Sequence, residues 1–224
     1  MTAYPVTKEF PNSLEDNMRV LTHSLRGRSW LVVLALFAVS CSTPTPAPGP
    51  DRPTAITEDE VRAAQAAWCK GLIDIATASE QTYVKVANDF IDKAYDFSGN
   101  GRLFFRPTLA YKPHAFRTDK PGTLSYFIGG NPAFPNDGNG FARGPWATCE
   151  YSNDLGNGVN GIQIHGDIAL AMGTVTLTDR SGKKTVVDKA FAFRKQAPNQ
   201  LKLIVHMSAK SNESPTPTPT PCPK

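Results

Sequence analysis

The segment 201–208 near the C-terminus brings a histidine and a hydroxyl together at alternate positions. Side chains of an extended chain point to opposite faces in turn, so His206 and Ser208 are predicted to share one face. Lys202 and Ile204 belong to the same face. A histidine next to a hydroxyl in a cavity can relay a proton in general acid–base catalysis. A polar edge strand that faces solvent is the alternative that this pattern leaves open.

The opposite face of this segment is wholly apolar and is expected to pack on the core. It consists of Leu201, Leu203, Val205 and Met207. In a curved sheet with one packed face the other face lines the cavity, so His206 and Ser208 are predicted to point together into it.

The other histidines carry weaker signals. His165 follows Ile162 and Ile164, which take the core face, so it is predicted to face the other way before a turn, in a structural role. His114 lies in a loop and carries no predicted function. A three-histidine zinc site would have to join His114, His165 and His206, and their spacing does not favour it. The chain also lacks Cys-x-x-Cys and His-x-x-x-His spacing, so no metal ligands are predicted.

The stretch 129–146 is rich in Gly, Pro and Asn and is too long for a simple connection. Loops of that length are often lids or binding loops. Phe134, Phe141 and Trp146 are expected to pin it to the body of the protein. A purely structural surface loop fits the composition equally well.

The elements that position these residues follow from periodicity. Thr57 and Glu60 form a capping box before an apolar pattern of helical spacing. The elements expected after this helix are a helix over 81–95, short strands over 103–106 and 115–117, a brief helix over 123–128, and strands over 147–151, 161–165, 168–178, 185–194 and 201–208. Helices followed by antiparallel strands indicate the α+β class. A curved sheet wrapped around N-terminal helices makes a cone with a pocket at its mouth, the nuclear-transport-factor-2-like architecture.

An export signal is predicted at the N-terminus. The apolar run 30–39 is too short for a membrane span, which needs roughly 20 residues. It follows Arg19, Arg26 and Arg28 and precedes small residues that end at Cys41, the order found in a secretory signal peptide. The cysteine resembles the lipobox of bacterial lipoproteins, which implies cleavage before Cys41 and a diacylglycerol on its thiol. A buried core helix that ends in cysteine is the alternative.

Residues 1–40 are therefore predicted to be removed, with Met18 as an alternative start. We expect a lipoprotein of the cell envelope, anchored in a membrane through Cys41 and facing the periplasm or the exterior. The Pro/Thr-rich segments 41–56 and 212–224 cannot pack a core and are predicted to be a linker and a disordered tail. One domain, 57–211, lies between them.

Net charge bears on the class of partner, and cysteine content bears on disulfide bonding. The net charge is +4, and no dense patch of Lys and Arg is present, so nucleic acid is not an expected partner. In an oxidising compartment Cys69 and Cys149 could form a disulfide, although sequence alone does not fix the pairing. Cys222, in the tail, has no assigned role.

The domain resembles the iota-class carbonic anhydrases from about residue 60 to residue 208. The blocks that carry the resemblance are Phe105-Arg106-Pro107-Thr108, residues 124–131, Gly140-Phe141 with Pro145-Trp146, residues 165–173, and Val205-His206-Met207-Ser208. Several blocks in the right order are more specific than any single motif.

The resemblance implies a homodimer formed through the sheets and reversible hydration of carbon dioxide to bicarbonate. It implies that Thr108, Tyr126, His206 and Ser208 are catalytic and that Thr108, Tyr126 and Ser208 bind the substrate. We assign Tyr126 and Ser208 to holding water, Thr108 to the bicarbonate oxygens, and His206 to orienting the network or accepting the proton. No metal or other cofactor is expected, although zinc or manganese has been associated with some members.

One block departs from the family pattern. Family members commonly read His-His-Ser-Ser where this chain reads His-Met-Ser-Ala over 206–209. On strand alternation Met207 points into the core, so the loss of a polar group there is expected to be silent; Ala209 has no such explanation. A non-catalytic module that holds a small anion or an apolar ligand is the alternative function, because such folds host many activities.

Overall fold

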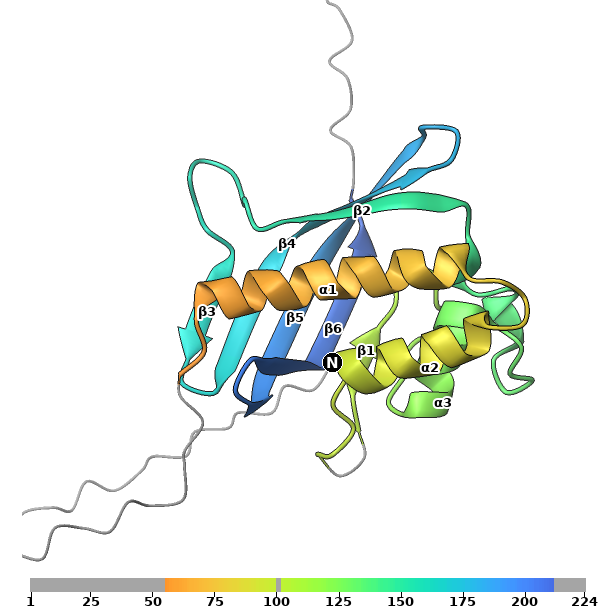
Figure 1. The fold of residues 1–224 in the computed structure, drawn as a ribbon, viewed down its shortest axis with the longest axis horizontal. Coiled ribbons are helices and arrows are strands. Elements are labelled where there is room, and N and C mark those ends of the chain that lie inside the picture. The colour runs from red at the N-terminus through yellow and green to blue at the C-terminus, as the bar shows by residue number, and fades with distance from the viewer. Residues whose placement is uncertain (1–54, 100–101, 212–224) are drawn as a thin grey trace, which may run out of the picture. The chain divides into compact units, whose positions relative to one another are not determined.

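The computed structural model describes residues 55–99 and 102–211 of the 224-residue chain (Figure 1). The predicted signal peptide 1–40, the lipidation site Cys41, most of the linker 41–56 and the tail 212–224 lie outside the described residues. Within those residues, no helix is long and apolar enough to cross a membrane.

The predicted helices are present, with shifted boundaries. The helix α1, Glu58–Thr77, begins at the predicted capping box, where Thr57 Oγ1 accepts from the Glu60 N–H at 3.2 Å. The helix α3 begins earlier than predicted, because Asp119 caps the Gly122 N–H at 2.8 Å. The other bounds are α2 Tyr83–Ala94, α3 Lys120–Ile128, and the short 3₁₀ helices η1 Pro135–Asp137 and η2 Phe141–Arg143.

The strands form one sheet in the order β1-β6-β5-β4-β2, and β3 also pairs with β4. Their bounds are β1 Phe104–Arg106, β2 Trp146–Ser152, β3 Ile162–His165, β4 Ile168–Asp179, β5 Lys184–Ala197 and β6 Gln200–Lys210. Only β1 and β6 run parallel among these strands. The predicted strand over 115–117 is instead a single bridge between Arg117 and Phe105.

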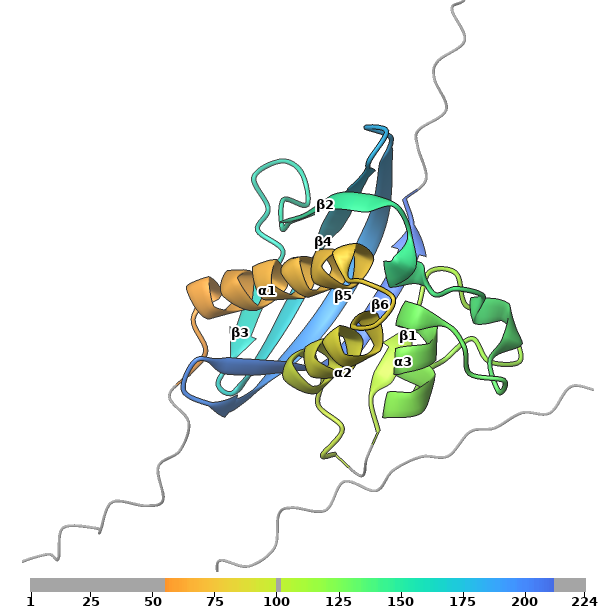
Figure 2. The same ribbon diagram turned by 45° about the vertical axis from the view of Figure 1, so that its right-hand side comes forward.

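The helices and the sheet form two layers. Helices α1 and α2 lie across one face of the curved sheet, which we call the inner face, and α3 lies beside α2 and β1 (Figures 1 and 2). Between the layers are aromatic and aliphatic side chains such as Trp68, Phe90, Phe191 and Leu203. The predicted α+β class and nuclear-transport-factor-2-like architecture are confirmed.

A β-bulge in β6 changes which side chains face the core. Phe193 pairs with Leu203, but the next residue, Ala192, pairs with Val205, so Ile204 is an extra residue in the ladder. An extra residue reverses the alternation that follows it. Leu203 and His206 are therefore both buried, each 1% exposed.

The predicted apolar face of β6 was therefore wrong beyond the bulge. Leu201 and Leu203 do pack in the core, but Val205 is only half-buried. Met207 is 53% exposed and lies on the outer face, so its predicted position in the core was also wrong. Ser208 takes the inner face together with His206, so the two do share a face, but the prediction that this face lies opposite the packed face of Leu201 and Leu203 was wrong, because the bulge turns both residues inward.

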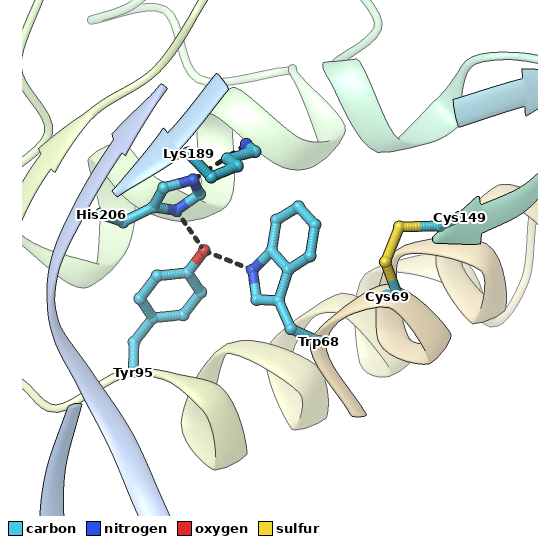
Figure 3. Close-up of a disulfide and its surroundings, with 6 residues drawn as sticks. All are labelled: Trp68, Cys69, Tyr95, Cys149, Lys189 and His206. Carbon is cyan, nitrogen blue, oxygen red and sulfur yellow. Dashed lines mark hydrogen bonds between the residues drawn. A yellow bond between two sulfur atoms is a disulfide. The ribbon is translucent and has the colours of Figure 1, made fainter. Parts of the chain in front are cut away.

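A disulfide ties the two layers together. It joins Cys69 of α1 to Cys149 of β2, with the Cα atoms 5.2 Å apart. This is the pairing that the sequence left open, and it fixes α1 on the sheet next to Trp68 (Figure 3).

Candidate active site

The closest pair of functional side chains is formed by two hydroxyls. β1 runs parallel to β6, with Phe105 opposite His206, and this register carries Thr108 to Ser208. The two hydroxyl oxygens are 2.6 Å apart. Ser208 is buried and Thr108 is half-buried. A hydroxyl carries one proton, so whichever of the two donates to the other leaves the second proton available to a ligand.

Tyr126 reaches the same loop as Thr108. It belongs to α3, is buried, and its phenol lies near the backbone of Leu109, the neighbour of Thr108. Its ring packs edge-on against Phe105 at 5.4 Å and stacks on Phe141 at 5.6 Å between ring centroids. These ring contacts fix the position of the Tyr126 side chain.

His206 sits behind the hydroxyls, in an aromatic cage. Its ring stacks on Phe105 at 4.3 Å and meets the edges of Phe191 and Trp68 at 4.7 Å and 5.5 Å between centroids. Both ring nitrogens have partners: Nδ1 is 2.9 Å from the Tyr95 hydroxyl, and Nε2 is 3.0 Å from Lys189 Nζ. His206 is therefore held on both sides.

These contacts form one chain of four buried side chains (Figure 3). Trp68 of α1 donates its indole N–H to the Tyr95 oxygen at 3.0 Å. Tyr95 follows α2 directly, His206 belongs to β6, and Lys189 belongs to β5. Helices and sheet thus converge on the two nitrogens of His206.

Burial sets the protonation of this cluster. It lowers the pKa of His206 well below its ordinary value, and the neighbouring Lys189 acts in the same direction. Burial raises the pKa of Tyr95 and of Tyr126, so both phenols stay protonated. Burial lowers the pKa of Lys189 to about 7. In this cluster Lys189 is the group that changes charge near neutral pH.

The structure brings the predicted residues into one region, and it adds three that sequence reasoning missed. Thr108 and Ser208 are in contact, Tyr126 lies near the backbone of Leu109, which follows Thr108, and His206 lies on the same strand face as Ser208. The missed residues are Trp68, Tyr95 and Lys189. Of these three, only Lys189 is indicated by the sequence, because it shares a strand face with apolar residues that are expected to face the core.

The remaining histidines lie elsewhere. His165 is exposed at the end of β3, and the His114 ring packs against Phe134 at 5.3 Å. In residues 55–99 and 102–211, no group of three or more His, Cys, Asp or Glu side chains is arranged to hold a metal ion.

The loop 129–146 is anchored through a buried ion pair. Asp137 accepts from Arg117 at 2.7 Å and from the Ser125 hydroxyl at 2.6 Å. The predicted anchors contribute as well: Phe134 lies under the Arg117 guanidinium at 4.3 Å, and Trp146 donates to the Phe141 carbonyl at 2.8 Å. Because Phe141 stacks on Tyr126, this loop supports one wall of the site.

Comparison with known proteins identifies the class. The family model for metal-independent carbonic anhydrases matches residues 59–210, nearly all of the described domain. The chain belongs to this family, as its resemblance to the iota class predicted.

Individual relatives agree with this assignment. A metal-independent carbonic anhydrase of Nostoc sp. strain PCC 7120 is 41% identical over 159 residues, covering 69% of this chain and 74% of the relative. Among solved structures, the iota-carbonic anhydrase from a cyanobacterium complexed with bicarbonate is 39% identical, with a TM-score of 0.66, and the match covers 74% of this chain and 99% of that one.

Proposed function

We propose that this protein catalyses the reversible hydration of carbon dioxide to bicarbonate at Thr108, Tyr126 and Ser208, with His206 behind them. The observation that carries the proposal is the hydroxyl pair of Thr108 and Ser208, whose oxygens are 2.6 Å apart. The family membership and the bicarbonate complex of the cyanobacterial relative support it.

The chemistry requires an activated water. A zinc enzyme provides it by lowering the pKa of bound water to about 7. Here Ser208 and Tyr126 hold the water, and Thr108 donates to the oxygen on which negative charge develops. The raised pKa of Tyr126 keeps its phenol a donor throughout the reaction. General base catalysis contributes typically about 10²–10⁴-fold, so we expect a modest turnover.

The residues present do not suit a metal ion. A metal ligand must offer a free lone pair, and both nitrogens of His206 are engaged by Tyr95 and Lys189. The remaining groups of the cluster are neutral hydroxyls and the single Lys189 amine, and none of them is a thiolate, imidazole or carboxylate, the ligands that zinc takes in proteins. The proposed reaction therefore proceeds without zinc or manganese.

Two substitutions test the site. Ser208→Ala and Tyr126→Phe should each lower kcat/KM for carbon dioxide hydration at least about tenfold, as loss of a positioned hydroxyl removes a transition-state contact. Exposed counterparts provide matched controls: Ser181→Ala and Tyr111→Phe should leave the rate unchanged. Full activity in both site variants would reject these assignments.

A non-catalytic binding function has one observation in its favour. A groove of about 470 Å³ runs between α1 and α2, with apolar side chains at its base, including Trp68, Phe90 and Leu203. Its volume lies in the range of small-molecule sites. Saturable binding of an apolar fluorescent probe in this groove, together with no hydration activity, would favour the binding module over the enzyme.

We further propose that two copies pair through the outer face of the sheet. The strand register sets Leu170, Val205 and Phe104 in one row and Met172 and Met207 in the next. Leu170, Met172, Met207 and Phe104 are 43%, 56%, 53% and 66% exposed. A cluster of large exposed apolar side chains on one surface is typical of an interface.

Sedimentation tests the pairing. A Met207→Lys variant should sediment as a monomer, whereas Tyr111→Lys, at an exposed position outside the strands, should behave like the wild type. A monomeric wild type would end this part of the proposal.

The location of the enzyme completes the proposal: export through the signal peptide 1–40 and anchoring through a lipid on Cys41. Support comes from the order of basic, apolar and small residues before the cysteine. A clickable fatty acid supplied to expressing cells should label the wild type and Cys222→Ser but not Cys41→Ser. Equal labelling of all three would contradict lipidation at Cys41.

A further inference from the structure

The hydration step releases a proton, and the described hydroxyl groups are poor candidates to accept it. Thr108 and Ser208 are neutral hydroxyls, and the raised pKa of Tyr126 means that its phenol is already protonated. His206 has both nitrogens engaged, and burial lowers its pKa far below neutrality. A general base works best when its pKa lies near the working pH.

Lys189 is positioned to accept this proton. It is the register partner of Ser208 across β5 and β6, and both side chains are on the inner face, 6% and 5% exposed. Directly opposed residues in such a ladder have Cβ atoms about 5 Å apart. The Lys189 amine contacts His206 Nε2 at 3.0 Å, although the residue paired with Lys189 is Ser208. The side chain of Lys189 therefore spans from the position opposite Ser208 toward His206.

The surroundings of Lys189 favour an uncharged amine. In residues 55–99 and 102–211, no carboxylate forms an ion pair or hydrogen bond with it. The Trp68 ring of α1 lies 4.8 Å from its Nζ, His206 of β6 contacts the amine, and Tyr95, which follows α2, contacts the far side of His206. None of these side chains is negatively charged near neutral pH, and burial lowers the pKa of Lys189 to about 7.

We propose that Lys189 is the base of the hydration reaction, held in place by His206; this inference rests on the proposed function. The water oxygen bonds to the carbon of carbon dioxide, and one C=O electron pair moves onto its oxygen. The O–H bond of the water breaks, and the proton passes, directly or through the Ser208 hydroxyl, to the lone pair of Lys189 Nζ. The products are bicarbonate and an ammonium side by side, so the buried site gains no net charge. The ammonium returns its proton to solvent as bicarbonate leaves.

This role fixes the tautomer of His206. For the lone pair of Lys189 Nζ to be available, the Lys189 amine must donate one N–H to His206 Nε2. His206 then carries its proton on Nδ1 and donates it to the Tyr95 oxygen, which also accepts from Trp68, so this role requires the Tyr95 O–H to turn away from His206, its acceptor in the opposite tautomer. In the opposite tautomer Nε2–H would occupy the lone pair of the amine, and no base would remain.

Kinetics of three variants test the proposal. Lys189→Met should lower kcat/KM for hydration about 10²-fold or more, while Lys184→Met, an exposed position on the same strand, should match the wild type. Lys189→Cys alkylated with 2-bromoethylamine restores an amine of lower intrinsic basicity; it should regain activity, with the pH midpoint of kcat/KM shifted down. Alkylated wild type is the control.

Nitrogen NMR of His206 supplies a readout that does not need activity, and the expected spectrum is that of the Nδ1–H tautomer. An Nε2–H tautomer, or a Lys189→Met variant as active as the wild type with the same pH profile, would overturn the role of Lys189. An inactive wild type would instead overturn the proposed function on which it rests.

Discussion

Replacing Lys189 with methionine should change how the stability of the protein depends on pH. Burial lowers the pKa of Lys189 from 10.5 to about 7. Between these two values the unfolded chain holds a proton on this amine that the folded protein has lost. Unfolding therefore takes up a proton, and the stability of the wild type rises with pH across this window.

The size of the effect follows from the width of the window. One proton changes the free energy of unfolding by about 1.4 kcal/mol per pH unit inside it. From about pH 7 to about pH 9.5, the wild type should therefore gain on the order of 3 kcal/mol relative to Lys189→Met. Below the window the charged amine is buried at its full cost, so the variant should be the more stable protein at acidic pH.

Guanidinium unfolding across this pH range, with free thiols alkylated, measures the difference. Lys184→Met is the matched control, because this exposed lysine on the same strand should leave the pH dependence of the wild type intact. Parallel curves for wild type and Lys189→Met would refute the reasoning, since they would mean that the buried amine keeps an ordinary pKa.

Three further predictions concern the scaffold. Replacing Cys69 and Cys149 by alanine should lower the free energy of unfolding by about 4–5 kcal/mol, because the bridge spans 80 residues; denaturant titration measures this, and a loss under ~1 kcal/mol would count against the bridge. Asp137→Asn should cost about 3–5 kcal/mol, because it leaves the buried charge of Arg117 without its partner; thermal unfolding should show it, and an unchanged midpoint would contradict it. Thr57→Ala should cost about 1 kcal/mol by removing the α1 cap, measured by the same denaturant titration, with no change expected in hydration rate.

Local signals in the sequence predicted most of the fold. The capping box at Thr57 marks the start of α1, and the strands expected over 168–178 and 185–194 are present as β4 and β5. These features depend on residues close in the chain, so they can be read without tertiary contacts. The strand at 115–117 was overpredicted because a single bridge to Phe105 leaves the same local pattern as a short strand.

The errors arise where one element depends on another. Nothing in the run Leu201–Met207 signals the extra residue at Ile204, because the bulge is defined only by the pairing with β5. The alternation of side chains along an extended strand therefore predicted that His206 and Ser208 share a face, but it wrongly placed Met207 in the core.

The buried chain behind His206 was out of reach for a similar reason. Tyr95 lies 111 residues from His206 in sequence, and only the packing of helices on the sheet brings them together. Lys189 does share a strand face with apolar residues, but a lysine in a strand is usually a surface residue, and only the structure shows its contact with His206.

The central claim is that this protein hydrates carbon dioxide without a metal. Stopped-flow hydration by the purified protein, before and after exhaustive chelation and with metal content measured in both samples, tests it most directly. We predict a rate above the uncatalysed reaction that is the same in both samples and is lost in a Tyr126→Phe, Ser208→Ala double variant. A rate that disappears on chelation and returns with added zinc or manganese would contradict the account.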